Sequence, residues 1–141
     1  MRDLHNKVAV RQTLAPAVAT SDRTSAAADR RGFESVEHIV ALGASGDALT
    51  SSRRIDLRLE HSHDDTAWEP VSDADVLGVV VDANGVFATI DDATLDESVY
   101  SAGYVGGRRY SRVVADFAGS HANGTPVAAL ALMSHAHVKP V

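Results

Sequence analysis

The chain has 141 residues and a formal net charge of −6, and it contains no cysteine. This length is the common size of one domain with its own core, so we expect a single domain over residues 1–141. The absence of cysteine excludes disulfide scaffolds, thiolate catalysis and cysteine-based metal sites, and the negative charge argues against nucleic acid as a partner, because such binding needs clustered Lys and Arg.

The N-terminal region predicts one strand followed by a polar arm. Residues 7–14 (KVAVRQTL) form the first expected strand, and residues 20–32 are polar and rich in turn formers. We interpret residues 1–30 as a strand plus an extended arm that orders only on contact. The opening residues lack the apolar segment of a signal peptide, and no run approaches the ~20 apolar residues of a membrane span. We expect a protein that is made in the cytosol and is soluble there unless an assembly carries it out, with no membrane partner.

Residues 32–43 (GFESVEHIVALG) fit two different periods. Phe33, Val36 and Val40 would share one face of a helix, whereas alternate residues from Val36 to Leu42 would share one face of a strand. The flanking glycines and the β-branched residues favour the strand.

The clearest strand signal is RRIDLRLEHS, in which Ile55, Leu57 and Leu59 alternate with charged residues. Further strands are expected over residues 85–91, 98–105, 108–117 and 126–134. The last of these is almost continuously apolar, which indicates a strand covered on both faces or one at a subunit contact. Because turn clusters separate the strand patterns, the sequence predicts an all-β fold, an antiparallel β-sandwich of jelly-roll type.

Gly106 and Gly107 lie between two of these patterns, in YVGGRRYSRV. A Gly-Gly pair suits the positive φ angles of a two-residue hairpin, so we expect a hairpin whose second strand begins at Arg108 and Arg109. Phosphate-binding glycine loops lie between a strand and the helix that follows it. The chain contains neither GxxxxGK[ST] nor GxGxxG, the two motifs of such loops.

Trp68 is the only tryptophan. A large ring buries much apolar area, so we expect it to plug the core at the start of a strand; the alternative is a platform that stacks on a sugar.

Histidines and paired acids offer the remaining chemistry. His61 and His63 in HSHDD would make a metal site only with a third ligand, for which the candidates are His121, His135 and His137. We expect solvated loops instead, with His135 and His137 on the surface near the C-terminus. The acid pairs at residues 91–92 and 96–97 match no calcium-loop pattern, and the serines match no nucleophile motif. We therefore expect no enzyme activity, no catalytic residue, no metal and no cofactor.

Two stretches carry a resemblance to a known group of proteins. Residues 54–78 and 87–141, together with residues 14–18 (LAPAV), resemble small virion proteins of tailed bacteriophages and of phage-derived gene transfer agents. The most specific run is Y-x-G-G-x-R-Y-x-R-V at residues 104–113, followed by G-x-x-x-N-G-T-P at residues 119–126. The N-terminal 30 residues match least.

The resemblance implies a non-enzymatic structural protein on the outer surface of a capsid, as the base of a head spike or as a decoration at vertices. The implied partners are the major capsid protein, a spike fibre or other virion proteins, and further copies of the chain in a ring, with a pentamer favoured. A neck ring at the head–tail joint and a carbohydrate-binding module of the virion are the alternatives. Candidate interface residues are Arg108, Arg109, Tyr110, Arg112, His135 and His137.

Overall fold

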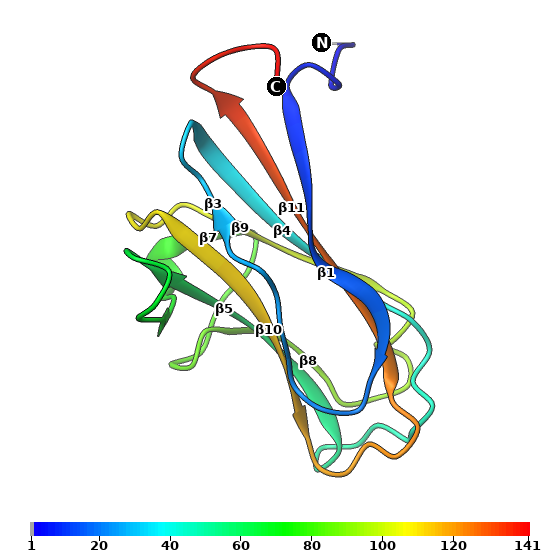
Figure 1. Ribbon diagram of the computed structural model, residues 1–141. Helices are drawn as coiled ribbons and strands as arrows, with labels where there is room; N and C mark the ends of the chain where they lie inside the picture. Colours follow the sequence, from blue (N-terminus) through cyan, green and yellow to red (C-terminus); the bar gives the residue numbers. More distant parts are fainter. Residues whose placement is uncertain (1) are drawn as a thin grey trace.

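The structure is a computed structural model that describes residues 2–141. It consists of two antiparallel β-sheets packed face to face, with one short 3₁₀ helix. Figure 1 shows both chain termini at the same end of the molecule. The strands are β1 (Val8–Ala19), β2 (Arg23–Thr24), β3 (Ala28–Asp29), β4 (Phe33–Leu42), β5 (Arg54–Ser62), β6 (Glu69–Pro70), β7 (Val76–Leu77), β8 (Val86–Ile90), β9 (Val99–Tyr104), β10 (Tyr110–Ala118) and β11 (Thr125–Ala136), and the helix is η1 (Asp73–Asp75).

The strand order confirms the predicted sandwich. Sheet A has the order β1-β11-β4-β9-β7, and sheet B has the order β2-β10-β5-β6, with β3 also pairing with β10 and β8 with β5. The paired strands are therefore nested along the sequence, so that each pair encloses the next. The outermost pair is β1–β11, then β2 and β3 pair with β10, then β4 pairs with β9, and the innermost pair is β5–β8. Because successive pairs alternate between the sheets, the chain has the jelly-roll arrangement.

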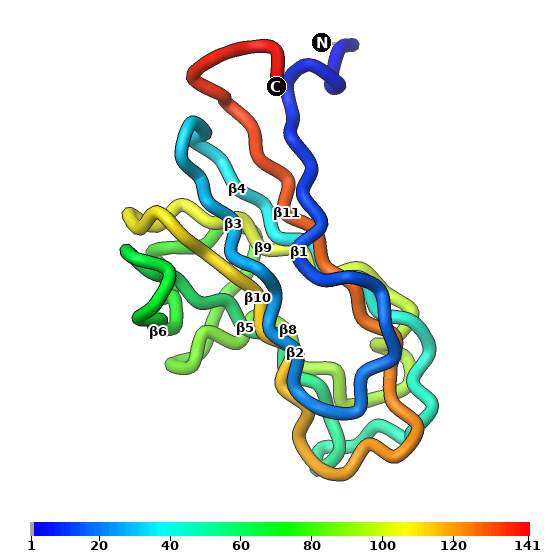
Figure 2. The backbone as a smooth tube through the Cα atoms, in the orientation of Figure 1, coloured from blue at the N-terminus to red at the C-terminus, as the bar shows by residue number. Residues whose placement is uncertain are grey.

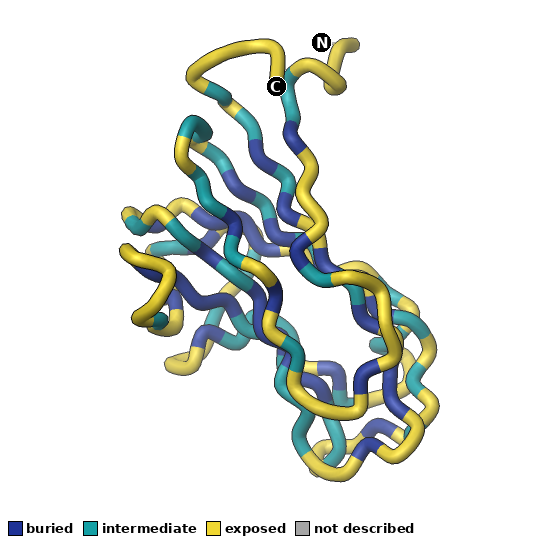
Figure 3. Tube along the Cα trace, in the orientation of Figure 1, coloured by how far each residue is buried: buried dark blue, intermediate teal, exposed yellow. Residues whose placement is uncertain are grey.

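The core lies between the two sheets and is built from small aliphatic side chains. Along β4 and β11, buried residues alternate with partly or fully exposed ones, as Figure 3 shows. Ile55, Leu57 and Leu59 of β5 are fully buried, as their alternation with charged residues predicts. Burying a side chain of this size contributes about 1.5–3 kcal/mol. No helix among residues 2–141 is long and apolar enough to cross a membrane.

β1 is longer than the sequence pattern predicts, and it lies at the edge of sheet A. Its register with β11 shifts between Gln12 and Leu14 and again between Leu14 and Ala17. These irregularities surround Pro16, which has no N–H to donate and is tolerated at an edge or a bulge. The strand can therefore continue past the proline to Ala19.

Residues 20–32 lie along sheet B instead of extending away from the domain. β2 and β3 pair with β10, and the N–H of Ser25 donates to the carbonyl of Val113 at 2.9 Å. Figure 2 shows this part of the tube running beside β10. The segment interpreted as an arm thus forms the edge of the sandwich.

The Gly-Gly hairpin prediction is wrong. β9 belongs to sheet A and β10 to sheet B, so residues 105–109 cross from one sheet to the other. Neither Gly106 nor Gly107 has a positive φ. Close approach explains the first glycine, because a Cβ at Gly106 would lie 2.6 Å from the ring of Tyr104, whereas a Cβ at Gly107 would meet nothing within 4 Å.

Candidate functional site

The outward side of sheet A is the main candidate for a functional surface. On this side, the side chains that point away from the core are mostly apolar, and they lie opposite one another on neighbouring strands. We call this surface the apolar face. Its most exposed side chains are Val10 at 55%, Leu77 at 60%, Val99 at 66% and Leu130 at 37%. Between them lie Ile39, Ala41, Ala128 and Leu132.

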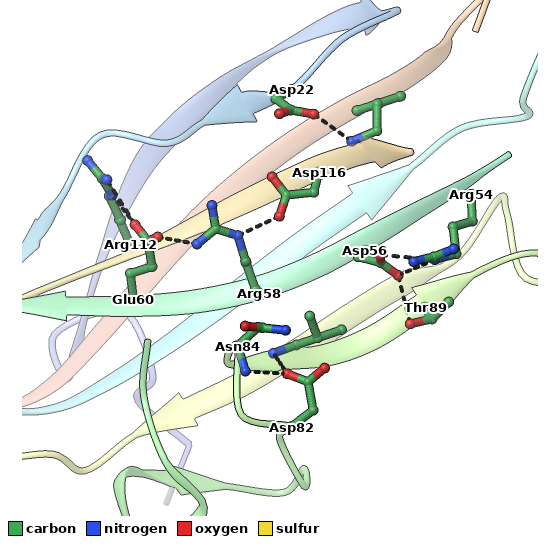
Figure 4. Close-up of polar contacts among 12 residues, drawn as sticks. Asp22, Arg54, Asp56, Arg58, Glu60, Asp82, Asn84, Thr89, Arg112 and Asp116 are labelled. Carbon is green, nitrogen blue, oxygen red and sulfur yellow. Dashed lines mark hydrogen bonds and ion pairs between the residues drawn. The ribbon is translucent and has the colours of Figure 1, made fainter. Parts of the chain in front are cut away.

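The outward side of sheet B is built in the opposite way. Arg54 pairs with Asp56 at 3.0 Å, and Arg58 contacts both Glu60 and Asp116. Figure 4 shows these guanidinium and carboxylate groups side by side on neighbouring strands. Ion pairs within the chain engage these charged groups, so the outer face of sheet A is the better candidate for a contact surface.

The apolar face contains a hollow of about 250 Å³. Leu77, Val105 and Leu132 form its apolar walls, and Gly103 lies in its floor. The Glu37 carboxylate lies close above Gly103, since a Cβ added there would be 2.9 Å from Glu37 Oε2. Glu37 is half-buried, and it takes part in none of the ion pairs found among residues 2–141. A half-buried carboxylate on an apolar surface loses solvation without gaining a partner inside its own chain.

The arginines predicted as interface residues are already engaged within the chain. Arg108 pairs with Glu69, and Arg109 makes two hydrogen bonds to Asp29, at 2.9 and 2.7 Å. The Arg109 guanidinium lowers the pKa of the Asp29 carboxyl. It also lies 4.8 Å from the ring centroid of Tyr110. These ion pairs tie the loop before β10 to β3 and to β6.

Arg112 makes two contacts on the outside of sheet B. Its guanidinium pairs with Glu60 at 2.8 Å, and it lies over the ring of Trp68 at 4.0 Å from the centroid. The prediction that Trp68 plugs the core is wrong, because the ring is half-buried on the outer surface. Stacking on a planar cation stabilises the ring there, and it covers one face that a sugar platform would need.

His61 and His63 do not converge on one site. His61 is buried, with its Nδ1 atom 3.0 Å from the Tyr104 hydroxyl, whereas His63 is exposed. Burial lowers the pKa of the His61 imidazole. Among residues 2–141, no group of three or more His, Asp or Glu side chains is arranged to hold a metal ion.

The two C-terminal histidines lie on the surface at the end of β11. His135 Nδ1 is 2.8 Å from Ser35 Oγ, and the His137 N–H donates to the Gly32 carbonyl at 2.9 Å. His137 also lies 3.7 Å from a carboxylate oxygen of Glu34. His121 is buried elsewhere, 2.9 Å from the Ala118 carbonyl, and makes no contact with His135 or His137.

The acid pairs serve local turns. Asp92 accepts a hydrogen bond from the Thr94 N–H at 2.9 Å, which lowers its carboxyl pKa, and Asp96 accepts one from the Ser45 N–H at 2.8 Å. Such contacts close loops at the end of the sandwich.

The sequence interpretation missed most of the apolar face. One signal was available, because the continuous apolar run at residues 126–134 indicated a subunit contact. Val10, Leu77 and Val99 belong to separate segments of the chain, and only sheet pairing gathers them. A comparison of this chain with protein-family models and with curated proteins finds no match.

Proposed function

We propose that this chain is a non-enzymatic structural protein on the outside of a phage-like capsid, as the base of a head spike or a decoration at vertices. The apolar face is the observation that carries the proposal. Contiguous exposed apolar surface marks a contact with another molecule, and Val10, Val99 and Leu130 supply it on three strands.

The fold and the charge support the same role. Jelly rolls are common in viral capsid domains, although this fold hosts many functions and supports the role only by analogy. Packaged DNA repels a protein of net charge −6, which favours the outer surface of a shell over its inner surface. The resemblance of residues 104–126 to small virion proteins agrees with this position.

The partners are the major capsid protein on one side and further copies of the chain in a ring, with a spike fibre or another virion protein above it. A pentamer fits a capsid vertex, where the symmetry is fivefold. A ring at the head–tail joint is the nearest alternative place.

The test is co-sedimentation of the purified chain with phage-like particles that lack it. The expected result is saturable binding that falls strongly for the variant Val99→Thr with Leu130→Gln. The matched control is Arg54→Gln on the outer side of sheet B, which is expected to bind as the unaltered chain does. Absence of binding by the unaltered chain contradicts the proposal. Imaging of labelled particles separates sites around the head from one ring at the neck.

A further inference from the structure

Two features of the chain complement each other in chemistry. The hollow in the apolar face offers aliphatic walls and the unpaired carboxylate of Glu37. The C-terminal tail, residues 137–141 (HVKPV), offers an aliphatic side chain next to a cation. Val138 is 81% exposed, and Lys139 takes part in none of the ion pairs found in the described part of the chain.

Residues 137–141 of a given copy do not line the hollow in that copy, although Lys139 lies beside Ser134 and His135 at its border. The hydrogen bond from the His137 N–H to the Gly32 carbonyl turns the chain toward the β3–β4 turn. Val138 and Val141 then line a different cavity, next to Gly32 and the start of β1. Figure 1 shows the tail curving at the end of the molecule toward the N-terminus. The position of the tail leaves the hollow open to another molecule.

We infer that the hollow binds the C-terminal tail of a second copy of this chain, with Val138 against Leu77, Val105 and Leu132 and with Lys139 paired to Glu37. The choice of occupant follows from charge. Glu37 is the carboxylate in the lining of the hollow, which also contains Ser35, Ser134 and His135. Lys139 supplies the positive charge that Glu37 does not find in the ion pairs of residues 2–141. A cation from the tail neutralises the one carboxylate there.

The contact joins two different surfaces, the tail of one copy and the face of the next. Such a heterologous contact generates a closed ring when the rotation between copies closes. The inference rests on the proposed function, because the tail-to-face contact is the one that would join neighbouring copies in the proposed ring. Its test is the mass of the purified protein and needs no particle.

The first experiment measures mass by light scattering and sedimentation at several concentrations. The full-length chain is expected to form an oligomer, and a chain that ends at Ala136 is expected to be a monomer with unchanged circular dichroism. A labelled peptide of residues 136–141 is expected to bind the truncated chain, and the same peptide with Lys139→Glu to bind at least about fivefold more weakly. An oligomer that survives truncation, or a full-length chain that is always monomeric, overturns the inference.

The second experiment tests the ion pair by exchanging the charges. Glu37→Lys alone and Lys139→Glu alone are each expected to raise the dissociation constant of the oligomer at least about fivefold. The double variant is expected to recover most of that loss, and Arg54→Gln, a charge on the outer side of sheet B, serves as the control. A double variant that stays as weak as the singles overturns the inference. Because particle binding is measured separately, a truncated chain that is monomeric but still co-sediments supports both this contact and the proposed function.

Discussion

The Nε2 atom of His38 lies 2.7 Å from the Oγ of Ser111, and this contact joins the inner faces of the two sheets. Ser111 pairs across the ladder with His61, whose Nδ1 contacts the Tyr104 hydroxyl. The aliphatic core therefore contains a buried polar cluster of two imidazoles and two hydroxyls at one end. Burial alone lowers the pKa of His38 to about 4 from its ordinary value of 6.5.

The first prediction is a loss of stability in mildly acidic solution. His38 is fully buried and neutral in the folded state, so the unfolded chain binds more protons between about pH 6.5 and 4. The contribution of His38 to the free energy of unfolding is expected to have its full value above pH 6.5. The free energy of unfolding is expected to fall by about 3 kcal/mol as the pH drops from 6.5 to about 4. Urea unfolding at a series of pH values measures it.

The control for this prediction is His38→Gln. The variant is expected to be less stable at neutral pH, yet to show a smaller slope of stability against pH, because the titrating group is gone. The remaining slope reflects His61, whose pKa is also lowered by burial. Equal slopes for the variant and the unaltered chain would contradict the assignment to His38.

The second prediction separates the two glycines of the crossing loop. Gly106→Ala is expected to cost about 1–3 kcal/mol, because its new Cβ would overlap the ring of Tyr104. Gly107→Ala is expected to change stability by at most about 0.5 kcal/mol, since that position is open. Equilibrium unfolding of both variants measures the difference. Similar costs at the two positions would sink the explanation by close approach.

The third prediction ranks two sets of ion pairs. Glu60 is only 7% exposed and contacts both Arg58 and Arg112, so Glu60→Gln removes the carboxylate partner of Arg112 and one of the two carboxylates that contact Arg58. We expect a loss of about 2 kcal/mol. Arg109→Gln breaks an ion pair whose side chains are 43% and 40% exposed, and we expect a loss below about 1 kcal/mol. The reverse order in thermal or urea unfolding would contradict this ranking.

The fourth prediction uses Trp68 as a fluorescent reporter. Arg112→Ala removes the guanidinium that covers the ring, so the emission is expected to move to longer wavelength and acrylamide quenching to increase. Arg58→Ala is the matched control, because it removes the other cation on Glu60 without touching the ring. Identical spectra for the two variants would show that the stacking does not shield the indole.

The sequence predicted the strands and their inner faces because neighbouring side chains in a strand point to opposite sides of the sheet. Ile55, Leu57 and Leu59 reveal their buried face through three alternations alone. The same local rule resolved residues 32–43 as a strand, and β4 confirms it. The two-residue alternation of apolar side chains and the spacing of the turns were thus enough to predict the all-β sandwich.

Local pattern could not decide which strands pair. The Gly-Gly segment has the composition of a hairpin, yet β9 finds its partners in β4 and β7, and β10 finds its partners in β2, β3 and β5. Nested pairing of distant strands overrode the local turn preference. Trp68 escaped prediction for the same reason, since Arg112 is distant in sequence and reaches the ring only through the packing of sheet B.

The sequence by itself determined an all-β chain with a small-aliphatic core, because the side-chain period of a strand is written in consecutive residues. Tertiary structure alone decided where the outward apolar residues gather. Val10, Leu77, Val99 and Leu130 come from four strands, and only the order β1-β11-β4-β9-β7 places them on one surface around Glu37. Such a surface arises from hydrogen bonding between segments that are far apart in the chain, and no local window contains it.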